Sequence, residues 1–411
     1  MILQPKHGKK FKIALMKFIE LLFWISLFIV FYTYIGYGIL LFIMVKIKRM
    51  LYRKKQTMMN NESLPDVTLL IPAYNESDYV HQKMKNSLEL NFPKDQLKII
   101  WVTDGSDDGT NLLLEKYENV TLFHQDERKG KINAMNRVMP YVETPIVIFS
   151  DANTLLGEDS IHHIINCFKD SKVGCVSGEK RIVSNKTDRA AGAGEGLYWR
   201  YESTLKKWDA ELYSAVGAAG ELFAIRTKLY EEVEEDTILD DFIISLRVAQ
   251  KGYIIDYNPE AYAIENASQN VKEELKRKIR ISAGGIQSVL RLKPLLNIFK
   301  YGLLSFQYIS HRVLRWIITP LCLVLLIPFS SMMAYQEGIF DFGVYSSFFW
   351  MQTSMYLAAF IGWVLENKST RIKILFVPYY FFMMNLSVVL GFFRFINKSQ
   401  SVNWERAKRA V

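Results

Sequence analysis

The sequence predicts an α/β domain with a mostly parallel sheet, flanked by transmembrane helices. Two observations indicate this class. Four long apolar runs gather towards the two ends of the 411-residue chain, and short β-rich runs alternate with helical patterns between them. Hydrophobic residues make up 50% of the chain and charged residues 23%, which excludes a disordered or collagen-like protein. Three cysteines without metal-type spacing exclude a disulfide scaffold and a cysteine zinc site.

The four apolar runs predict a multi-pass protein of the cell membrane. Each is uncharged and about 20 to 25 residues long, enough to span the hydrocarbon core of a bilayer. The first run is too long for a secretory signal and is followed by basic residues, so we expect a retained anchor. The runs are Leu21–Val45, Trp316–Gln336, Phe342–Leu365 and Ile374–Phe393.

Basic residues border the first run, and the chain has a formal net charge of +9. Lysines 6, 9, 10 and 12 precede this run, and six basic residues follow it: Lys46, Lys48, Arg49, Arg53, Lys54 and Lys55. This bias predicts that the middle of the chain is cytoplasmic. Because the basic excess lies at the membrane borders, no nucleic-acid partner is needed to explain it, and membrane lipids are the expected contact. The sequence does not decide on which side of the membrane the C-terminal tail lies, since four crossings would put this basic segment outside the cell.

The predicted organisation has five parts. They are an N-terminal anchor with basic flanks (1–55), a cytosolic domain (56–291), an amphipathic interfacial segment (292–315), C-terminal transmembrane segments (316–396) and a basic tail (397–411). Within the cytosolic domain, short apolar runs separated by helical patterns indicate βαβ units. The expected strands of the first half are Val67–Ile71, Ile99–Thr103, Val120–Phe123 and Ile146–Phe149.

Acidic residues follow three of these strands: Glu76, Asp104 and Asp151. Each loop alone would be ordinary turn chemistry. However, the carboxyl ends of parallel strands share one edge of a sheet, where ligands bind. Crowded carboxylates need a cation or a donor-rich ligand, and oxygen ligands suit Mg²⁺ or Mn²⁺ bound together with substrate phosphates. No P-loop signature occurs, which disfavours a kinase or ATPase.

Six motifs in order carry a family resemblance. They are PAYNE (Pro72–Glu76), DGSDDGT (Asp104–Thr110), GKINAMN (Gly130–Asn136), SDAN (Ser150–Asn153), GELFAIR (Gly220–Arg226) and LDDFIISLRV (Leu239–Val248). In this order and spacing the chain resembles family 2 glycosyltransferases, and more narrowly the membrane-embedded branch of cellulose, hyaluronan and poly-N-acetylglucosamine synthases. The resemblance implies a Rossmann-like GT-A fold and an inverting transfer from a nucleotide-diphospho sugar.

The resemblance also implies a donor site. Tyr74 and Glu76 match positions near the base, and Pro72 belongs to the same nucleotide-sugar-binding set. Asp104 matches the residue that contacts the nucleoside, and Lys131 matches a residue beside the nucleotide. Asp151 heads the family's Asp-x-Asp position, where Mg²⁺ or Mn²⁺ bridges the diphosphate. The third residue here is Asn153, which weakens the metal site without abolishing it, since its amide carbonyl is still an oxygen ligand.

The general base is expected at Asp241, in the pair Asp240-Asp241. Acidic residues also favour a helix N-terminus, and both interpretations can hold. A basic helix, Val271 to about Arg291, follows. Its basic face would suit anionic headgroups, or it matches the family's Gln-x-x-Arg-Trp element, in which Arg280 and Arg277 would bind phosphate.

That element departs from the family at two positions, because Arg277 replaces the glutamine and Ile281 the tryptophan. Losing an aromatic platform for a sugar favours a single-sugar transferase over a polymerising enzyme. Another aromatic residue, Trp199, could stack on an acceptor sugar, but core packing is the expected use.

These inferences favour a membrane-bound glycosyltransferase that moves a sugar, expected from a UDP-sugar, to a growing polysaccharide. The alternatives are a single-sugar transferase acting on a lipid-linked acceptor, and a catalytically inactive membrane subunit. The expected partners are a nucleotide-sugar donor, a glycan or lipid-linked acceptor, and export or assembly proteins.

Overall fold

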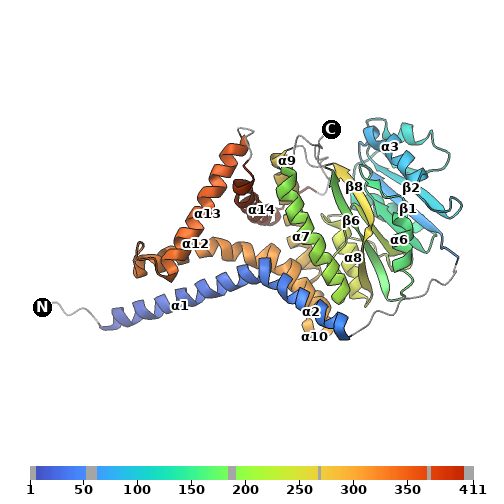
Figure 1. Cartoon of the computed structure of the whole chain (residues 1–411). Coiled ribbons are helices and arrows are strands. Elements are labelled where there is room, and N and C mark those ends of the chain that lie inside the picture. Colours follow the sequence, from blue (N-terminus) through green and yellow to red (C-terminus); the bar gives the residue numbers. More distant parts are fainter. Residues whose placement is uncertain (1–5, 52–62, 184–190, 267–269, 368–371, 402–411) are drawn as a thin grey trace. The chain divides into compact units, whose positions relative to one another are not determined.

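A computed structural model describes residues 6–51, 63–183, 191–266, 270–367 and 372–401 of the chain (Figure 1). The basic residues predicted at 53–55 and the tail after residue 401 lie outside these described ranges. The chain divides into two compact units, one of residues 1–40 and 309–390 and the other of residues 41–308 and 391–411.

The larger unit is built on one eight-stranded sheet with the strand order β3-β2-β1-β4-β7-β6-β8-β5. The first four strands in this order are parallel, whereas β7 runs antiparallel to both of its neighbours, and β5 is antiparallel to β8. The predicted α/β class with a mostly parallel sheet is therefore confirmed. The strands are β1 (Val67–Ala73), β2 (Leu97–Asp104), β3 (Thr121–Gln125), β4 (Ile146–Ser150), β5 (Leu155–Leu156), β6 (Val173–Val183), β7 (Leu222–Arg226) and β8 (Ile254–Asn266).

The central strands are buried on both faces, as their continuous apolar runs require. Every residue of β1 is buried, and Val67 lies opposite Leu97 on β2 and Ile146 on β4. Trp101 on β2 is fully buried in the same core. This register brings the carboxyl ends of β1, β2 and β4 to one edge of the sheet.

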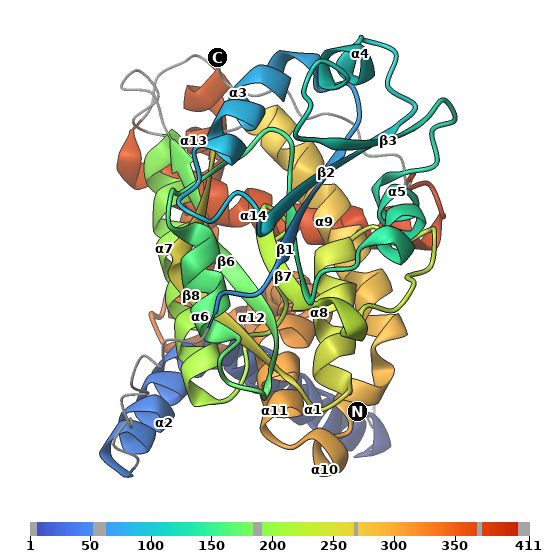
Figure 2. The same cartoon turned by 90° about the vertical axis from the view of Figure 1, so that its right-hand side faces the viewer.

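Helices cover both faces of the sheet. Figure 1 shows α6 and α7 on opposite sides of β6 and β8, and both helices pack against β8. Figure 2 views the sheet from the side of α3 and α6. The helices of this unit are α3 (Ser77–Leu88), α4 (Thr110–Leu114), α5 (Lys131–Val138), α6 (Ser160–Cys167), α7 (Ala191–Leu212), α8 (Asp240–Gln250), α9 (Val271–Arg291), α10 (Ile298–Tyr301) and α11 (Leu303–Tyr308).

Among its described residues, the smaller unit forms helices joined by loops and contains no strand. Four helical stretches are long and apolar enough to cross a bilayer: Lys10–Leu51, Leu303–Glu337, Val344–Glu366 and Ile374–Ile396. They comprise α1 (Lys6–Phe31), α2 (Tyr37–Leu51), α12 (Thr319–Glu337), α13 (Val344–Asn367) and α14 (Lys373–Ile396), with α11 and two π-helical segments, Tyr32–Gly36 and Ile309–Ile318. Of these stretches, residues 41–51, 303–308 and 391–396 belong to the larger unit.

Polar side chains inside this unit pair with one another, as the low dielectric of a bilayer favours. The Thr319 hydroxyl lies 2.9 Å from that of Thr33, and the Tyr34 hydroxyl donates to Asn385 Oδ1 at 2.6 Å. The last predicted run lies within one continuous helix, α14, although that run contains Pro378 and Asn385.

Candidate active site

The turn after β2 is tied to the next loop by Asp104. This buried carboxylate accepts hydrogen bonds from the backbone N–H groups of Lys129 at 3.0 Å and Gly130 at 2.7 Å. Gly105 follows with φ +69, and a Cβ there would lie 2.8 Å from Arg128 Cβ. Only glycine fits this turn, because the backbone is left-handed and the neighbouring loop passes too close for a side chain.

The loop after β1 packs against the same turn. The Arg128 guanidinium stacks 3.6 Å above the Tyr74 ring, and the Asn75 side chain pairs with Asp107 through two hydrogen bonds of 2.7 and 3.0 Å. The Glu76 backbone N–H donates to the Thr110 hydroxyl at 3.0 Å. The predicted base-contacting residues therefore gather at one end of β1 and β2, with Pro72 inside β1.

An ammonium group joins two carboxylates at the centre of this edge. Lys131 begins α5, and its Nζ lies 2.7 Å from Asp151 Oδ1, just beyond β4, and 3.3 Å from Asp240 Oδ2, at the start of α8. Burial alone would lower the pKa of Lys131, but the carboxylates of Asp151, Asp240 and Asp241 raise it well above its ordinary value. The side chain therefore stays cationic, while partial burial raises the pKa of Asp151 despite this ion pair.

Asp241 is the second carboxylate of α8 and is only partly buried. It faces the loop before β7, since a Cβ added to Gly220 would meet Asp241 Oδ2 at 3.3 Å. Desolvation and the neighbouring charge of Asp240 raise the pKa of Asp241 to about 7, although Lys131 opposes the shift. A carboxyl group with this pKa can exchange a proton near neutral pH.

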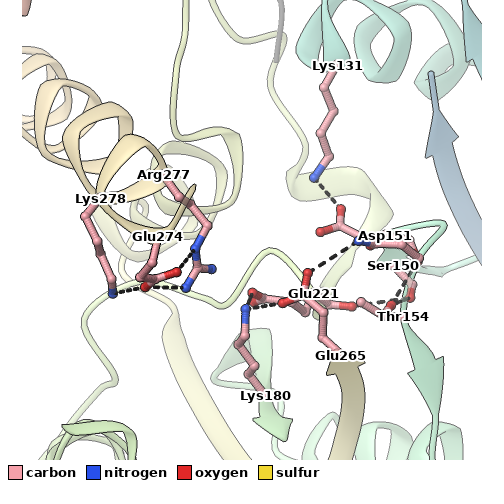
Figure 3. Close-up of polar contacts among 11 residues, drawn as sticks. Lys131, Ser150, Asp151, Thr154, Lys180, Glu221, Glu265, Glu274, Arg277 and Lys278 are labelled. Carbon is pink, nitrogen blue, oxygen red and sulfur yellow. Dashed lines mark hydrogen bonds and ion pairs between the residues drawn. The ribbon is translucent and has the colours of Figure 1, made fainter. Parts of the chain in front are cut away.

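A buried triad of charged residues supports the turn that follows β4; Figure 3 shows it beneath Asp151. The Lys180 ammonium, 3% exposed, bridges the carboxylates of Glu221 and Glu265, and Asn153 Nδ2 donates to Glu265 Oε1 at 3.4 Å. Burial alone would raise the pKa of Glu221, but Lys180 lowers it well below its usual range. The triad thus fixes the asparagine that replaces the family's second aspartate.

Lys83 on α3 holds the same turn from the other side. Its fully buried Nζ donates to Ser150 Oγ at 2.7 Å and to the Thr154 carbonyl at 2.8 Å. Burial lowers the pKa of Lys83 to about 7, and the charge of Asp151 counteracts part of that shift. Lys83 therefore holds Ser150 and Thr154, the residues on either side of the segment from Asp151 to Asn153.

Helix α9 brings further cations to the site. Arg277 pairs with both oxygens of Glu274 at 3.0 Å, and Lys278 Nζ lies 3.6 Å from the same carboxylate. Figure 3 shows this group on one side of the Lys180 triad and the Lys131–Asp151 pair on the other. The negative charges of Glu274, Glu265 and Glu221 raise the pKa of Arg277 despite its burial. Arg280 lies three residues further along the helix and is half-buried.

An aromatic side chain lies beside α9 where the sequence predicts core packing. Two ammonium groups lie near the ring of Trp199 on α7: that of Lys180 is 5.4 Å and that of Lys278 is 5.2 Å from the ring centroid. Ile281 occupies the position at which the resemblance leads one to expect tryptophan. The structure therefore places an aromatic ring next to α9 from a different helix.

The residues at the centre of the site suit a divalent ion only if phosphates complete the coordination. Within the described ranges, no group of three His, Cys, Asp or Glu side chains is placed to hold a metal ion by itself. Mg²⁺ and Mn²⁺ in nucleotide sites use one or two carboxylates plus phosphate oxygens. The Asp240 Oδ2 atom is buried without a hydrogen bond, and its nearest described cation is Lys131. An all-oxygen set with spare negative charge fits such an ion together with a diphosphate.

Sequence comparison identifies the domain that carries this geometry. Residues 68–234 match the model of glycosyl transferase family 2. The chain contains a family 2 glycosyltransferase domain. Its sequence is 29% identical over 286 residues to a poly-β-1,6-N-acetyl-D-glucosamine synthase of Staphylococcus aureus (strain MSSA476), covering 67% of each chain. It is 23% identical over 350 residues to the synthase of the same name from Staphylococcus epidermidis, covering 80% of this chain and 83% of the other.

The fold matches a solved glycosyltransferase along nearly the whole chain. A mannosyltransferase from Pyrobaculum calidifontis, in complex with GDP-mannose and Mn²⁺, superposes with a TM-score of 0.67 at 19% identity and covers 92% of this chain and 100% of that one. The predicted GT-A fold is confirmed. Together with the four candidate spans, these relatives make the protein a multi-pass membrane glycosyltransferase whose catalytic domain lies between its transmembrane helices.

Four residues of this site were not predicted from the sequence: Lys83, Lys180, Glu221 and Glu265. Glu221 stands inside the GELFAIR motif, which could have marked it. The two lysines resemble any helix or strand lysine, and only their burial reveals their use. Glu265 lies 112 residues from Asn153 along the chain, so no local pattern links the pair.

Proposed function

We propose that the protein is a membrane polysaccharide synthase, which transfers a sugar with inversion from a UDP-sugar to the end of a growing glycan. We further propose UDP-N-acetylglucosamine as the donor, because the staphylococcal relatives are poly-β-1,6-N-acetyl-D-glucosamine synthases. The observation that carries the proposal is the placement of Lys131 between Asp151 and Asp240, with Asp241 next to them facing Gly220.

In the proposed reaction, a hydroxyl of the acceptor attacks the anomeric carbon of the donor. Asp241 accepts the hydroxyl proton as the new carbon–oxygen bond forms, and the bond to the nucleoside diphosphate breaks on the opposite side. A carboxylate base of this kind contributes about 10²–10⁴-fold to the rate. Its pKa of about 7 suits this task, because the group is then half deprotonated at neutral pH.

The departing diphosphate needs positive charge. Lys131 is already held at the edge of the sheet as a cation and would stabilise charge that develops on the leaving group. Arg280 of α9, with Arg277 beside it, would bind phosphate oxygens. A Mg²⁺ or Mn²⁺ ion held by Asp151 and the Asn153 carbonyl would neutralise the diphosphate when bound. Tyr74, Glu76 and Asp104, together with Pro72, would receive the uridine.

A second candidate function is single-sugar transfer to a lipid-linked acceptor. The isoleucine at position 281 favours it, because the family's aromatic platform for a sugar ring is missing there. The Trp199 ring beside Lys278 supports chain extension instead, because it offers a face on which a sugar could stack.

Radiolabelled transfer tests the two candidates. The full-length protein in membranes would be supplied with UDP-N-acetylglucosamine, UDP-glucose, UDP-galactose and GDP-mannose in turn, each with Mg²⁺ and with Mn²⁺. The proposal predicts a product of many sugar units from UDP-N-acetylglucosamine, which requires a divalent ion. A product one sugar longer than the acceptor would favour the second candidate, and no transfer from any nucleotide sugar would contradict both.

A further inference from the structure

The segment that leads into α8 is held by one side chain of α9. Gln287 Oε1 accepts a hydrogen bond from the Ile238 backbone N–H at 3.0 Å, and its Nε2 donates to the Asp236 carbonyl at 2.8 Å. The glutamine is only 9% exposed. Its amide therefore pairs with one carbonyl and one N–H of the same segment, as a neighbouring strand would do.

This pairing needs the glutamine amide in particular. A glutamate at position 287 would keep the acceptor for the N–H of Ile238 but would set an oxygen against the carbonyl of Asp236. An apolar side chain would leave both backbone groups without a partner in a buried place, which would destabilise the segment.

Two further residues on the same face of α9 seat the segment. Gly284, one turn before Gln287, permits a close approach, since a Cβ there would lie 2.7 Å from Leu239 Cγ and 2.8 Å from Ile238 Cγ2. Arg291, one turn after Gln287, donates to the Thr237 hydroxyl at 2.6 Å and pairs with the Asp236 carboxylate. Positions 284, 287 and 291 follow the helical repeat, so they face the same way. We call these three residues the α9 clamp.

Helix α8 has no side chain of its own to fix where it starts. Leu239 is the residue before its first turn, and no side-chain hydrogen bond caps this end. Besides the ion pair between Lys131 and Asp240, the direction in which Asp240 and Asp241 leave the segment therefore depends on how the preceding backbone is held. The hydrogen bonds of Gln287 and the close approach at Gly284 hold the C-terminal half of α9 against the segment before α8. Because α9 also carries Arg277 and Arg280, one rigid helix links the phosphate-binding candidates to the segment that ends in the base.

We propose that the α9 clamp positions the catalytic base. Gln287 is its central positioning residue and sets the place of the Asp241 carboxylate relative to Arg280. The inference rests on the proposed function, in which Asp241 is the base. A displacement of about 1 Å in such a group can lower the rate about 10²-fold.

Steady-state transfer by full-length Gln287→Glu tests the clamp. We expect kcat to fall about 10- to 100-fold, while the KM for the nucleotide sugar and the binding of UDP stay within about twofold of the wild type. The pH at which kcat is half-maximal should also move, because the surroundings of Asp241 change. Arg291→Ala, on a more exposed side chain, should show the same pattern more weakly and covers the case in which Gln287→Glu folds poorly.

Ser288→Ala is the matched control, because Ser288 is buried on the same helical turn but donates only to the Gly284 carbonyl within α9. It should keep the wild-type kcat. The clamp is overturned if Gln287→Glu and Arg291→Ala, counted per UDP-binding molecule, also keep the wild-type kcat and pH profile. Asp241→Asn, measured in parallel, separates the two claims. If this variant is inactive while the clamp variants are normal, only the clamp fails, whereas a fully active Asp241→Asn removes the base and the clamp together.

Discussion

Replacing Asn153 with aspartate should destabilise the protein strongly, and the structure supplies the magnitude. Asn153 Nδ2 lies 3.4 Å from Glu265 Oε1, and Glu265 is only 2% exposed. Two like charges at this separation repel by about 5 kcal/mol at an effective dielectric constant of about 20. At pH 7 one carboxyl group would take up a proton instead, which limits the loss of folding free energy to about 4 kcal/mol, or about three pKa units.

A second change should reverse most of this loss. In Asn153→Asp with Glu265→Gln, the carboxylate and the amide exchange places, so one hydrogen bond is retained and the repulsion disappears. The double variant should be about 3 kcal/mol more stable than the sum of the two single changes. The third position of the Asp-x-Asp motif would then be asparagine here because the carboxylate of Glu265, which pairs with Lys180, already places a negative charge beside it.

Chemical denaturation of the full-length protein in detergent, followed by tryptophan fluorescence, measures these free energies. Asn91→Asp is the matched control, because Asn91 donates to Asp159 at 2.7 Å in an exposed pair. There the same substitution should cost less than about 1 kcal/mol. If the effects at positions 153 and 265 add within about 0.5 kcal/mol, the charge argument is wrong.

Three other predictions follow from the same site. The transfer rate should rise with pH through about 7, because Asp241 must lose its proton to act as a base. The contribution of Asp241 to folding stability has the opposite pH dependence: it is complete below about pH 4 and is lost as the pH rises through about 7, and denaturation at a series of pH values measures it. Lys131→Met should cost about 3–5 kcal/mol of stability and raise the donor KM, because Asp151 loses its counter-ion, whereas Lys131→Arg keeps the charge and should retain most of both. Gly105→Ala should weaken UDP binding and cost more stability than Gly109→Ala, since both glycines have φ above +60 but only the first lacks room for a Cβ; equal losses in calorimetry would contradict this.

Much of the fold follows from local patterns in the sequence. The apolar runs of β1, β2 and β4 and the turn residues after them predict a shared edge, because parallel strands end on the same side of a sheet. The basic helix predicted over Val271–Arg291 coincides with α9. These elements are encoded within a few residues, so composition and periodicity suffice.

The pairs that support the site could not be predicted in this way. Lys180 meets Glu265 across 85 residues, and Gln287 meets Ile238 across 49. The first pair is set by the parallel pairing of β6 with β8 and the second by the packing of α9, and neither leaves a periodic signal. A glycine such as Gly284 permits close packing, but the sequence does not say which segment approaches it.

The central claim is that Asp241 is the base of a transferase whose donor site lies around Asp104, Lys131 and Asp151. The most direct test compares sugar transfer and UDP binding in purified wild-type protein and in Asp241→Asn, with Mn²⁺ present. We expect the variant to bind UDP with wild-type affinity and to transfer sugar at least about 10²-fold more slowly. Transfer at the wild-type rate by Asp241→Asn would contradict it.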